Sequence, residues 1–330
     1  MQEGSRKAIV AAFLANLGIA VAKLVGFLIT GSAGLLAEAG HSIADTGNQG
    51  LLMLGGKRSR REATSDHPFG YGSERYFWAF VVALVLFSMG GLFALYEGIS
   101  KLRHPHETDN PIVAFVILGL AVALETYSLR TAIGEANHIK PRSMSWWRFI
   151  RTAKQAELPV VLLEDVGAEI GLLFALVGLA LAEITGNPRW DAVGSLAIGL
   201  LLVVIAVILA VETKGLLIGE AASGSAENAL RTALLATPGL QRVIHLRTLH
   251  LGPDELLVAA KVEFDADISF AELAGRIDRA EAAMRAAVPE AKVIYLEPDV
   301  YRANDGRRAN DGRVEADETA AVADDATARP

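Results

Sequence analysis

The chain has 330 residues, of which 52% are hydrophobic, and its formal net charge is −7 at pH 7. It contains no cysteine, which excludes disulfides and thiolate metal sites. No basic face is visible in the sequence, so nucleic-acid binding is disfavoured. The five methionines do not cluster, which disfavours Cu(I) as a bound ion, whereas histidine and carboxylate side chains suit Zn²⁺, Mn²⁺, Fe²⁺ or Co²⁺.

Long apolar blocks between residues 8 and 217 predict an α-helical membrane protein, because a spanning helix needs about 20 mainly apolar residues. The first block is too long for the apolar region of a signal peptide, so we interpret it as a span. Six blocks reach the required length: Ala8–Thr30, Ala33–Leu54, Tyr76–Ile99, Pro111–Ile133, Pro159–Ile184 and Ala192–Leu217.

Basic residues are distributed unevenly around these spans. They precede the first span and gather between spans two and three and between spans four and five, whereas the opposite loops hold fewer. The positive-inside rule therefore places these basic loops and both chain termini in the cytoplasm. No mitochondrial-type presequence is visible, which favours a multi-pass protein of a bacterial plasma membrane. The segment Glu135–Leu158 contains Trp146 and Trp147 and is either an interfacial segment or a plain flexible loop.

After Leu217 the sequence resembles that of a soluble domain. Helical and alternating patterns in the order α-β-β-α-β predict a small α+β sandwich, with helices packed on one face of a sheet. The expected elements are Ala226–Ala236, Val243–Leu251, Glu255–Phe264, Phe270–Ala287 and Lys292–Leu296. We expect three parts: a transport domain over 1–220, a cytoplasmic α+β domain over 221–302, and a disordered acidic tail over 303–330.

The sequence places ionisable side chains inside the apolar blocks, where charge is costly and usually functional. His41 and Asp45 are four residues apart in span two and so share one helix face. Imidazole and carboxylate are ligand types for divalent transition metals. A tetrahedral site needs about four ligands, and the acidic pair Glu164 and Asp165 in span five is the expected second source.

Several further residues are weaker candidates. Glu164 and Asp165 differ by about 100° around the helix, so one of them faces the metal and the other a neighbouring span or a proton path. Glu169 shares a face with Asp165 and is either a further ligand or a packing acid. Glu38 is a possible hydrogen-bond partner of the His41 imidazole. His67 is either a ligand where the metal enters or a cap of span three.

Other polar residues within or after the spans are expected to act differently. Asn16, Asn48 and Gln49 are expected to bond between helices. Lys23, Glu97 and Glu125 are interpreted as close to span ends and are expected to snorkel or to pair between helices. In the soluble part, His250 is a candidate for a regulatory metal site together with Glu297 and Asp299.

These motifs together resemble the cation diffusion facilitator family over residues 6–301. The resemblance rests on the run from Ser32 to Asp45 (SAGLLAEAGHSIAD), on His67–Gly72 (HPFGYG), on Trp190–Ser195 (WDAVGS) and on the tail domain. It implies a transport site between spans two and five, a ferredoxin-like cytoplasmic domain, a homodimer, and export of Zn²⁺ in exchange for protons, with no prosthetic group. Span five carries Glu164–Asp165 in place of the family's common His-x-x-x-Asp pattern, and in this it resembles a divergent branch of the family that has an adjacent Glu-Asp pair at the same place.

The expected mechanism is alternating access at a site near the middle of the membrane. The metal displaces protons from His41 and the acids, and protons from the other side displace the metal. A transporter of Mn²⁺ or Fe²⁺ is the first alternative, because span five is rich in oxygen ligands. A transport-inactive metal-binding scaffold or sensor is the second. No metalloprotease or serine-nucleophile motif is present, so we do not expect an enzyme.

Overall fold

The computed structural model describes residues 3–30, 33–105 and 111–302 of the chain. These residues form two compact units that divide between Ile218 and Gly219. The predicted acidic tail over 303–330 lies outside the described residues. Side chains at several positions of the first two helices, including Glu38 and His41, also lie outside the described part.

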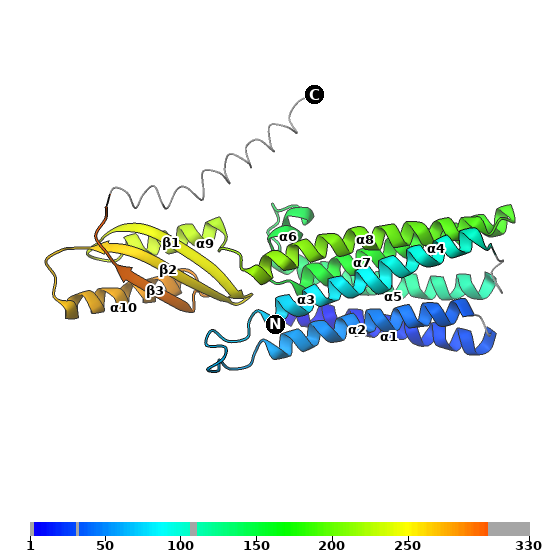
Figure 1. The fold of residues 1–330 in the computed structure, drawn as a ribbon, viewed down its shortest axis with the longest axis horizontal. Helices are drawn as coiled ribbons and strands as arrows, with labels where there is room; N and C mark the ends of the chain where they lie inside the picture. Colours follow the sequence, from blue (N-terminus) through cyan, green and yellow to red (C-terminus); the bar gives the residue numbers. More distant parts are fainter. Residues whose placement is uncertain (1–2, 31–32, 106–110, 303–330) are drawn as a thin grey trace, which may run out of the picture. The chain divides into compact units, whose positions relative to one another are not determined.

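The first unit is built from long helices that run side by side (Figure 1). The third helical stretch consists of two α-helical parts, α3 and α4, joined by a π-helical segment, η1. The elements are α1 (Glu3–Thr30), α2 (Ala33–Arg58), α3 (Glu74–Val85), η1 (Leu86–Leu92), α4 (Phe93–Arg103), α5 (Pro111–Ile139), α6 (Trp146–Thr152), α7 (Glu157–Thr185) and α8 (Arg189–Ile218).

These helices follow the apolar blocks of the sequence and extend beyond their ends by a few residues. Three of the described stretches are long and apolar enough to cross a membrane by length and composition: Glu74–Arg103, Pro111–Ile139 and Arg189–Ile218. The buried core joins residues of α1, α2, α3, α5, α7 and α8, among them Ile9, Leu52, Tyr76, Val161 and Leu209. The predicted helical architecture is therefore confirmed.

Glycines allow close approach between the third helical stretch and α8. A Cβ atom at Gly199 would lie 2.7 Å from the backbone nitrogen of Leu95, and one at Gly91 would lie 2.7 Å from Cγ2 of Val203. Small residues at helix interfaces are typical of membrane proteins, where packing replaces the hydrophobic effect between helices. The backbones of the third stretch and α8 therefore approach closely only because these positions lack side chains.

The π-helical segment η1 is a departure from the continuous helix predicted over Tyr76–Ile99. Ser88 Oγ donates to the carbonyl oxygens of Leu84 and Val85, at 2.8 and 3.4 Å. Gly90 and Gly91 follow within the segment. Serine back-bonding and paired glycines weaken the regular helical ladder, and such segments occur mostly within longer α-helices.

The second unit is an α+β domain, as predicted. It consists of α9 (Gly224–Leu235), β1 (Leu240–Gly252), β2 (Glu255–Phe264), α10 (Phe270–Ala287) and β3 (Val293–Pro298). The sheet has the order β1-β2-β3, with β1 antiparallel and β3 parallel to β2. Ser223 and Ser269 cap α9 and α10 by accepting hydrogen bonds from backbone N–H groups of the first turn.

Both helices of this unit cover one face of the sheet. The alternating β2 residues Leu256, Val258, Ala260 and Val262 are buried, and they share a core with Leu230 of α9 and Met284 of α10. A period of two places these four strand residues on the same face. The prediction that the helices pack on one face of the sheet is confirmed.

The short helix α6 lies within the segment for which an interfacial segment and a flexible loop were both considered. Ser145 caps it by accepting from the Arg148 backbone N–H at 3.2 Å. Phe149 and Ile150 are buried, whereas Trp146 and Trp147 are exposed. Lys140 Nζ lies 5.0 Å from the centre of the Trp146 ring. Exposed indoles beside basic groups are typical of a segment at the membrane surface.

Candidate metal-ion site

The predicted ligands belong to α2 and α7. Asp45 is a partly buried residue of α2, and Glu164 and Asp165 are buried residues of α7 with exposed fractions of 6% and 2%. The side chains of His41 and Glu38 lie outside the described part of the chain. The structure therefore buries the α7 acids within the helical unit, and ligation by His41 stays a prediction.

Glu164 is held by two amide side chains of α2. Asn48 Nδ2 donates to Oε1 of Glu164 at 3.0 Å, and Gln49 Nε2 donates to Oε2 at 2.6 Å. Asn48 and Gln49 are 1% and 0% exposed. These contacts confirm that Asn48 and Gln49 bond between helices, and they bring Glu164 to the face of α2 just after Asp45.

The other two acids of α7 are bonded to α5. Ser128 Oγ donates to Oδ2 of Asp165 at 2.7 Å, and Thr126 Oγ1 donates to Oε1 of Glu169 at 3.0 Å. The second carboxylate oxygen of Glu169, Oε2, is buried without a hydrogen-bond partner. Glu164 and Asp165 thus face different neighbours, as their angular separation of about 100° requires.

Glu125 is a buried acid whose place the sequence reasoning missed. It was expected near a span end, but it lies in the middle of the 29-residue helix α5 and is only 5% exposed. The negative charges of Asp165, Asp45 and Glu169 act on it unfavourably, and that of Lys23 favourably. Its central position in an apolar block was the signal that could have identified it, since charge at that depth is usually functional.

Lys23 of α1 brings a positive charge into this region. It is 5% exposed, and its Nζ donates to Ser42 Oγ of α2 at 3.0 Å, so its predicted interhelical pairing is confirmed. Ser42 follows His41 directly. Carboxylates from three helices and one ammonium group therefore lie within electrostatic range of one another. Neutral donors satisfy several carboxylate oxygens, but they do not cancel the charge.

Among the residues whose side chains the structure describes, no three histidine, aspartate or glutamate groups are close enough to bind a single metal ion. Asp45 nevertheless acts electrostatically on both Glu164 and Glu125. Carboxylates of α2, α5 and α7 therefore influence one another, and their joint ligation of a metal ion with His41 stays a prediction. The arrangement suits binding of a divalent cation or protons, because either would neutralise repelling carboxylates.

The weaker metal candidates do not gather with this group. His67 is exposed, and its ring stacks on Tyr71 with centroids 4.5 Å apart. His250 lies opposite Leu256 in the sheet, whereas Glu297 lies opposite Lys261, five residues further along β2. At about 3.4 Å per residue, that separation is roughly 17 Å. The structure does not bring His250 and Glu297 together within one chain.

Lys261 binds both acids of that regulatory hypothesis. Its Nζ lies 2.9 Å from Oδ2 of Asp299 and 3.1 Å from Oε1 of Glu297. Hydrogen bonds to Asp299 and Glu297 raise the pKa of Lys261, and the same lysine lowers the pKa of Asp299. An ammonium group therefore occupies the position where a regulatory metal was expected to bind these carboxylates.

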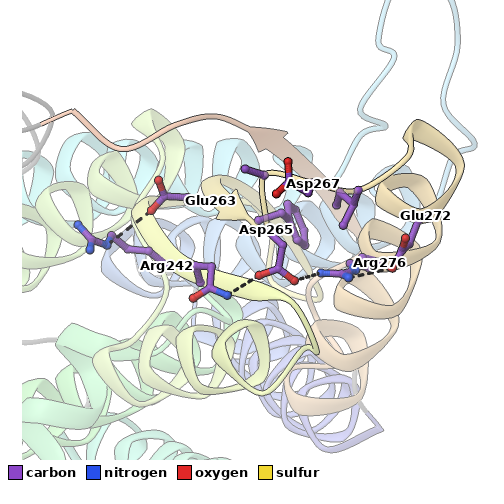
Figure 2. Close-up of a pocket in the computed structure, with 10 residues that line it drawn as sticks. Arg242, Glu263, Asp265, Asp267, Glu272 and Arg276 are labelled. Carbon is purple, nitrogen blue, oxygen red and sulfur yellow. Dashed lines mark hydrogen bonds and ion pairs between the residues drawn. The ribbon is translucent and has the colours of Figure 1, made fainter.

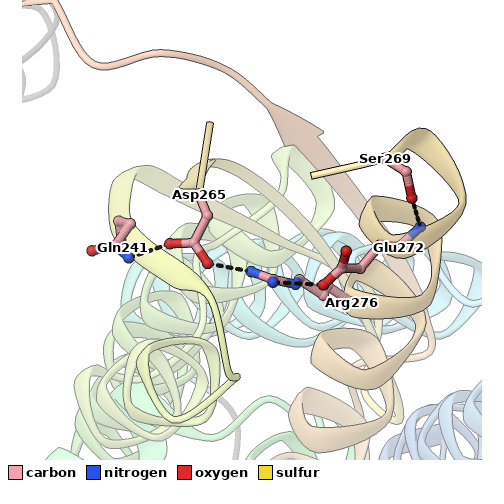
Figure 3. A network of polar contacts seen from close by, with 5 residues as sticks. All are labelled: Gln241, Asp265, Ser269, Glu272 and Arg276. Carbon is pink, nitrogen blue, oxygen red and sulfur yellow. Dashed lines mark hydrogen bonds and ion pairs between the residues drawn. The ribbon is translucent and has the colours of Figure 1, made fainter. Parts of the chain in front are cut away.

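An open polar pocket lies at the end of β2 that precedes α10, and charged residues line it (Figure 2). Its arginines already form ion pairs with acids. Nε of Arg242 lies 3.8 Å from Oε2 of Glu263, and Nη1 of Arg276 lies 2.6 Å from Oδ2 of Asp265. Arg276 also contacts Glu272, and Gln241 donates to Asp265 (Figure 3). The hydrogen bond from Arg276 lowers the pKa of Asp265. We interpret the network as a link between the end of the strand and the first turn of α10.

Two family models cover most of the chain. The Cation efflux transmembrane domain matches residues 9–218, and the Cation efflux protein, cytoplasmic domain matches residues 222–299. The chain is 30% identical over 244 residues to the human "Proton-coupled zinc antiporter SLC30A9, mitochondrial", covering 74% of this chain and 43% of that protein. It therefore spans less than half the length of this relative.

Two more distant relatives widen the comparison. "Metal tolerance protein C4" of Arabidopsis thaliana is 27% identical, covering 84% of this chain and 61% of that protein. "Zinc transporter ZitB" of Pectobacterium atrosepticum is 29% identical, covering 43% of this chain and 44% of that protein. The chain belongs to the cation diffusion facilitator family, whose members are metal transporters and not enzymes.

Proposed function

We propose that this member of the cation diffusion facilitator family exports Zn²⁺ from the cytoplasm in exchange for protons, as a homodimer in a bacterial plasma membrane. The observation that carries the proposal is the buried acidic group shared by α2, α5 and α7, in which Glu164 and Asp165 are almost fully buried. The similarity to a proton-coupled zinc antiporter supports the cargo and the coupling ion. The similarity to a cytoplasmic domain model named for dimerisation supports the homodimer.

The proposed transport site consists of His41 and Asp45 from α2 with Glu164 and Asp165 from α7. A divalent ion arriving from the cytoplasm neutralises carboxylates that repel one another, which makes binding favourable at this depth. Ligands must be deprotonated to bind the metal, so binding releases protons. Protons from the opposite side then return to the same groups and displace the metal. The exchange keeps the buried group from carrying an uncompensated charge.

Manganese or iron as the cargo is the second candidate, and the composition of α7 favours it. Glu164 and Asp165 supply only oxygen ligands, and oxygen ligands suit Mn²⁺ better than they suit Zn²⁺. The imidazole of His41 is the feature that favours Zn²⁺. Whether the protein prefers Zn²⁺ or Mn²⁺ therefore depends on whether the His41 nitrogen outweighs the carboxylate oxygens of α7 in the affinity for the ion.

Transport into proteoliposomes with an imposed pH gradient tests this proposal. We expect gradient-dependent uptake of Zn²⁺ in preference to Mn²⁺, Fe²⁺ and Co²⁺, and loss of uptake in Asp45→Ala and His41→Ala with the protein still folded. Glu183→Ala is the matched control, because Glu183 is an exposed acid of the same helix α7. Full transport by Asp45→Ala would refute the site, and a preference for Mn²⁺ would select the second candidate.

A further inference from the structure

Glu164 and Asp165 are neighbours in the proposed transport site but have different hydrogen-bond partners, and the transport site alone does not require the partners of Glu164. Both of its carboxylate oxygens accept hydrogen bonds from amide groups of α2, at 3.0 Å from Asn48 and 2.6 Å from Gln49. Asp165, the next residue, accepts instead from a hydroxyl group of α5. The three side chains Glu164, Asn48 and Gln49 form one buried cluster, which we call the amide cradle.

The amide cradle contains two unsatisfied acceptors. Oδ1 of Asn48 and Oε1 of Gln49 are buried and have no hydrogen-bond partner. A buried polar atom without a partner costs about 1–3 kcal/mol. Two such oxygen atoms beside one carboxylate indicate a site for a cation, because one positive ion could be coordinated by both oxygens together.

An amide group can serve Glu164 in two ways. It has a donor end and an acceptor end, and a turn of about 180° about its last torsion exchanges them. With its NH₂ group toward Glu164, it stabilises the bare carboxylate. With its carbonyl oxygen toward Glu164, it supplies a ligand to a cation bound there. A leucine or methionine at either position would do neither.

The position of the amide cradle along α2 separates it from Asp45. Asn48 and Gln49 follow Asp45 by three and four residues, so they lie on the same helix face about one turn, or roughly 5.4 Å, further along. This direction leads toward Lys57 and Arg58, the basic end of α2 that the proposed topology places in the cytoplasm. An ion moving outward would reach the amide cradle before Asp45.

We propose that the amide cradle is a separate binding position for the transported divalent cation, on the cytoplasmic side of Asp45 and made of oxygen ligands alone. The inference rests on the proposed function and adds a step to it. Glu164 first binds the ion with Asn48 and Gln49, and then shares it with His41, Asp45 and Asp165. Because carbonyl and carboxylate oxygens suit Mn²⁺ as well as other divalent ions, this position accepts ions that the histidine-containing site then discriminates.

Binding of Mn²⁺ to the full-length protein, measured by isothermal titration in nanodiscs, tests the inference. In an Asp45→Ala background, where transport is expected to be lost, we expect one Mn²⁺ per chain to remain bound at the amide cradle. Adding Asn48→Leu and Gln49→Met should remove that ion. Asn16→Leu is the control, because Asn16 is also a buried amide but does not bond to Glu164. An unchanged number of bound ions in the triple variant would overturn the inference.

A second variant keeps the test decisive if the triple variant does not fold. Asn48→Asp keeps the size of the side chain and adds a charged oxygen ligand, so Mn²⁺ should bind roughly tenfold more tightly. Equal or weaker binding would overturn the inference. Transport by the wild type is measured in parallel: its absence for every metal would reject the proposed function, whereas transport with unchanged Mn²⁺ binding in these variants would reject only the amide cradle.

Discussion

The ion pair between Arg75 at the start of α3 and Glu157 at the start of α7 provides a quantitative test of packing in the helical unit. Nη2 of Arg75 lies 2.9 Å from Oε2 of Glu157, and Nε of Arg75 contacts Oε1, so the contact is bidentate. The two side chains are only 2% and 1% exposed. Replacing Glu157 by leucine would leave a guanidinium group buried without its carboxylate.

We expect Glu157→Leu to lower the free energy of unfolding by about 3–5 kcal/mol, the usual cost of removing one partner of a buried pair. This corresponds to a change in the unfolding equilibrium constant of roughly 100- to 4,000-fold, since each 1.4 kcal/mol is a factor of ten. The double variant Arg75→Met/Glu157→Leu should recover most of the loss, because hydrophobic replacement of both partners is often close to neutral.

The assay is reversible unfolding of the full chain in detergent, followed by tryptophan fluorescence for the four variants of the double-mutant cycle. Glu212→Gln is the matched control, because its partner Arg151 is 59% exposed and such pairs contribute at most about 1 kcal/mol. A loss below about 1 kcal/mol in Glu157→Leu would refute the reasoning. A double variant no more stable than Glu157→Leu would refute it too, since the cost would then lie elsewhere than in the loss of the carboxylate beside Arg75.

Two further predictions concern helix approach and acid stability. Gly199→Ala should destabilise the helical unit by about 1–3 kcal/mol, because the added Cβ would lie 2.7 Å from the backbone nitrogen of Leu95. Gly119→Ala is the control and should not destabilise the unit, because a Cβ at Gly119 would have no neighbouring atom within 4 Å. Equal unfolding midpoints for the two variants would contradict this prediction. The pKa of Asp265 is lowered in the folded protein, so its contribution to stability is complete above the ordinary aspartate pKa of about 3.9 and is lost as the pH falls through the lowered folded value. Hydrogen exchange of the β1 and β2 amides in the full chain, corrected for the intrinsic exchange rate, should therefore accelerate as the pH falls below about 4. Asp265→Asn should weaken this pH dependence. An identical pH profile in the variant would contradict the role given to Asp265.

The sequence predicted the elements well where one periodicity continued to their ends. The bounds expected for Glu255–Phe264 and Phe270–Ala287 coincide with β2 and α10, because alternation and helical spacing are local properties of the chain. The π-helical segment η1 was not predicted. Ser88, Gly90 and Gly91 each occur in ordinary membrane helices, and their combined effect depends on the close approach of α8.

The candidate site was predictable in its residue types but not in its pairing. Asn48 and Glu164 are 116 residues apart, and no spacing rule relates them, since their contact depends on how α2 and α7 pack. Glu125 was assigned to a position near a span end, although it already lay well inside the predicted block Pro111–Ile133, and the helix, which continues to Ile139, places it in the middle.

The balance of charge in the helical unit is the physical argument for the proposed exchange of a metal ion for protons. Among the described side chains, the acids Asp45, Glu125, Glu164, Asp165 and Glu169 interact electrostatically, and Lys23 is the basic group that acts on Glu125. The donors to Glu164, Asp165 and Glu169 are amides and hydroxyls, which stabilise single oxygens without supplying charge. Charge at membrane depth is too costly to leave unpaired. In the proposed mechanism, bound cations therefore complete the neutralisation, and when a metal ion leaves, protons replace it on the same oxygens.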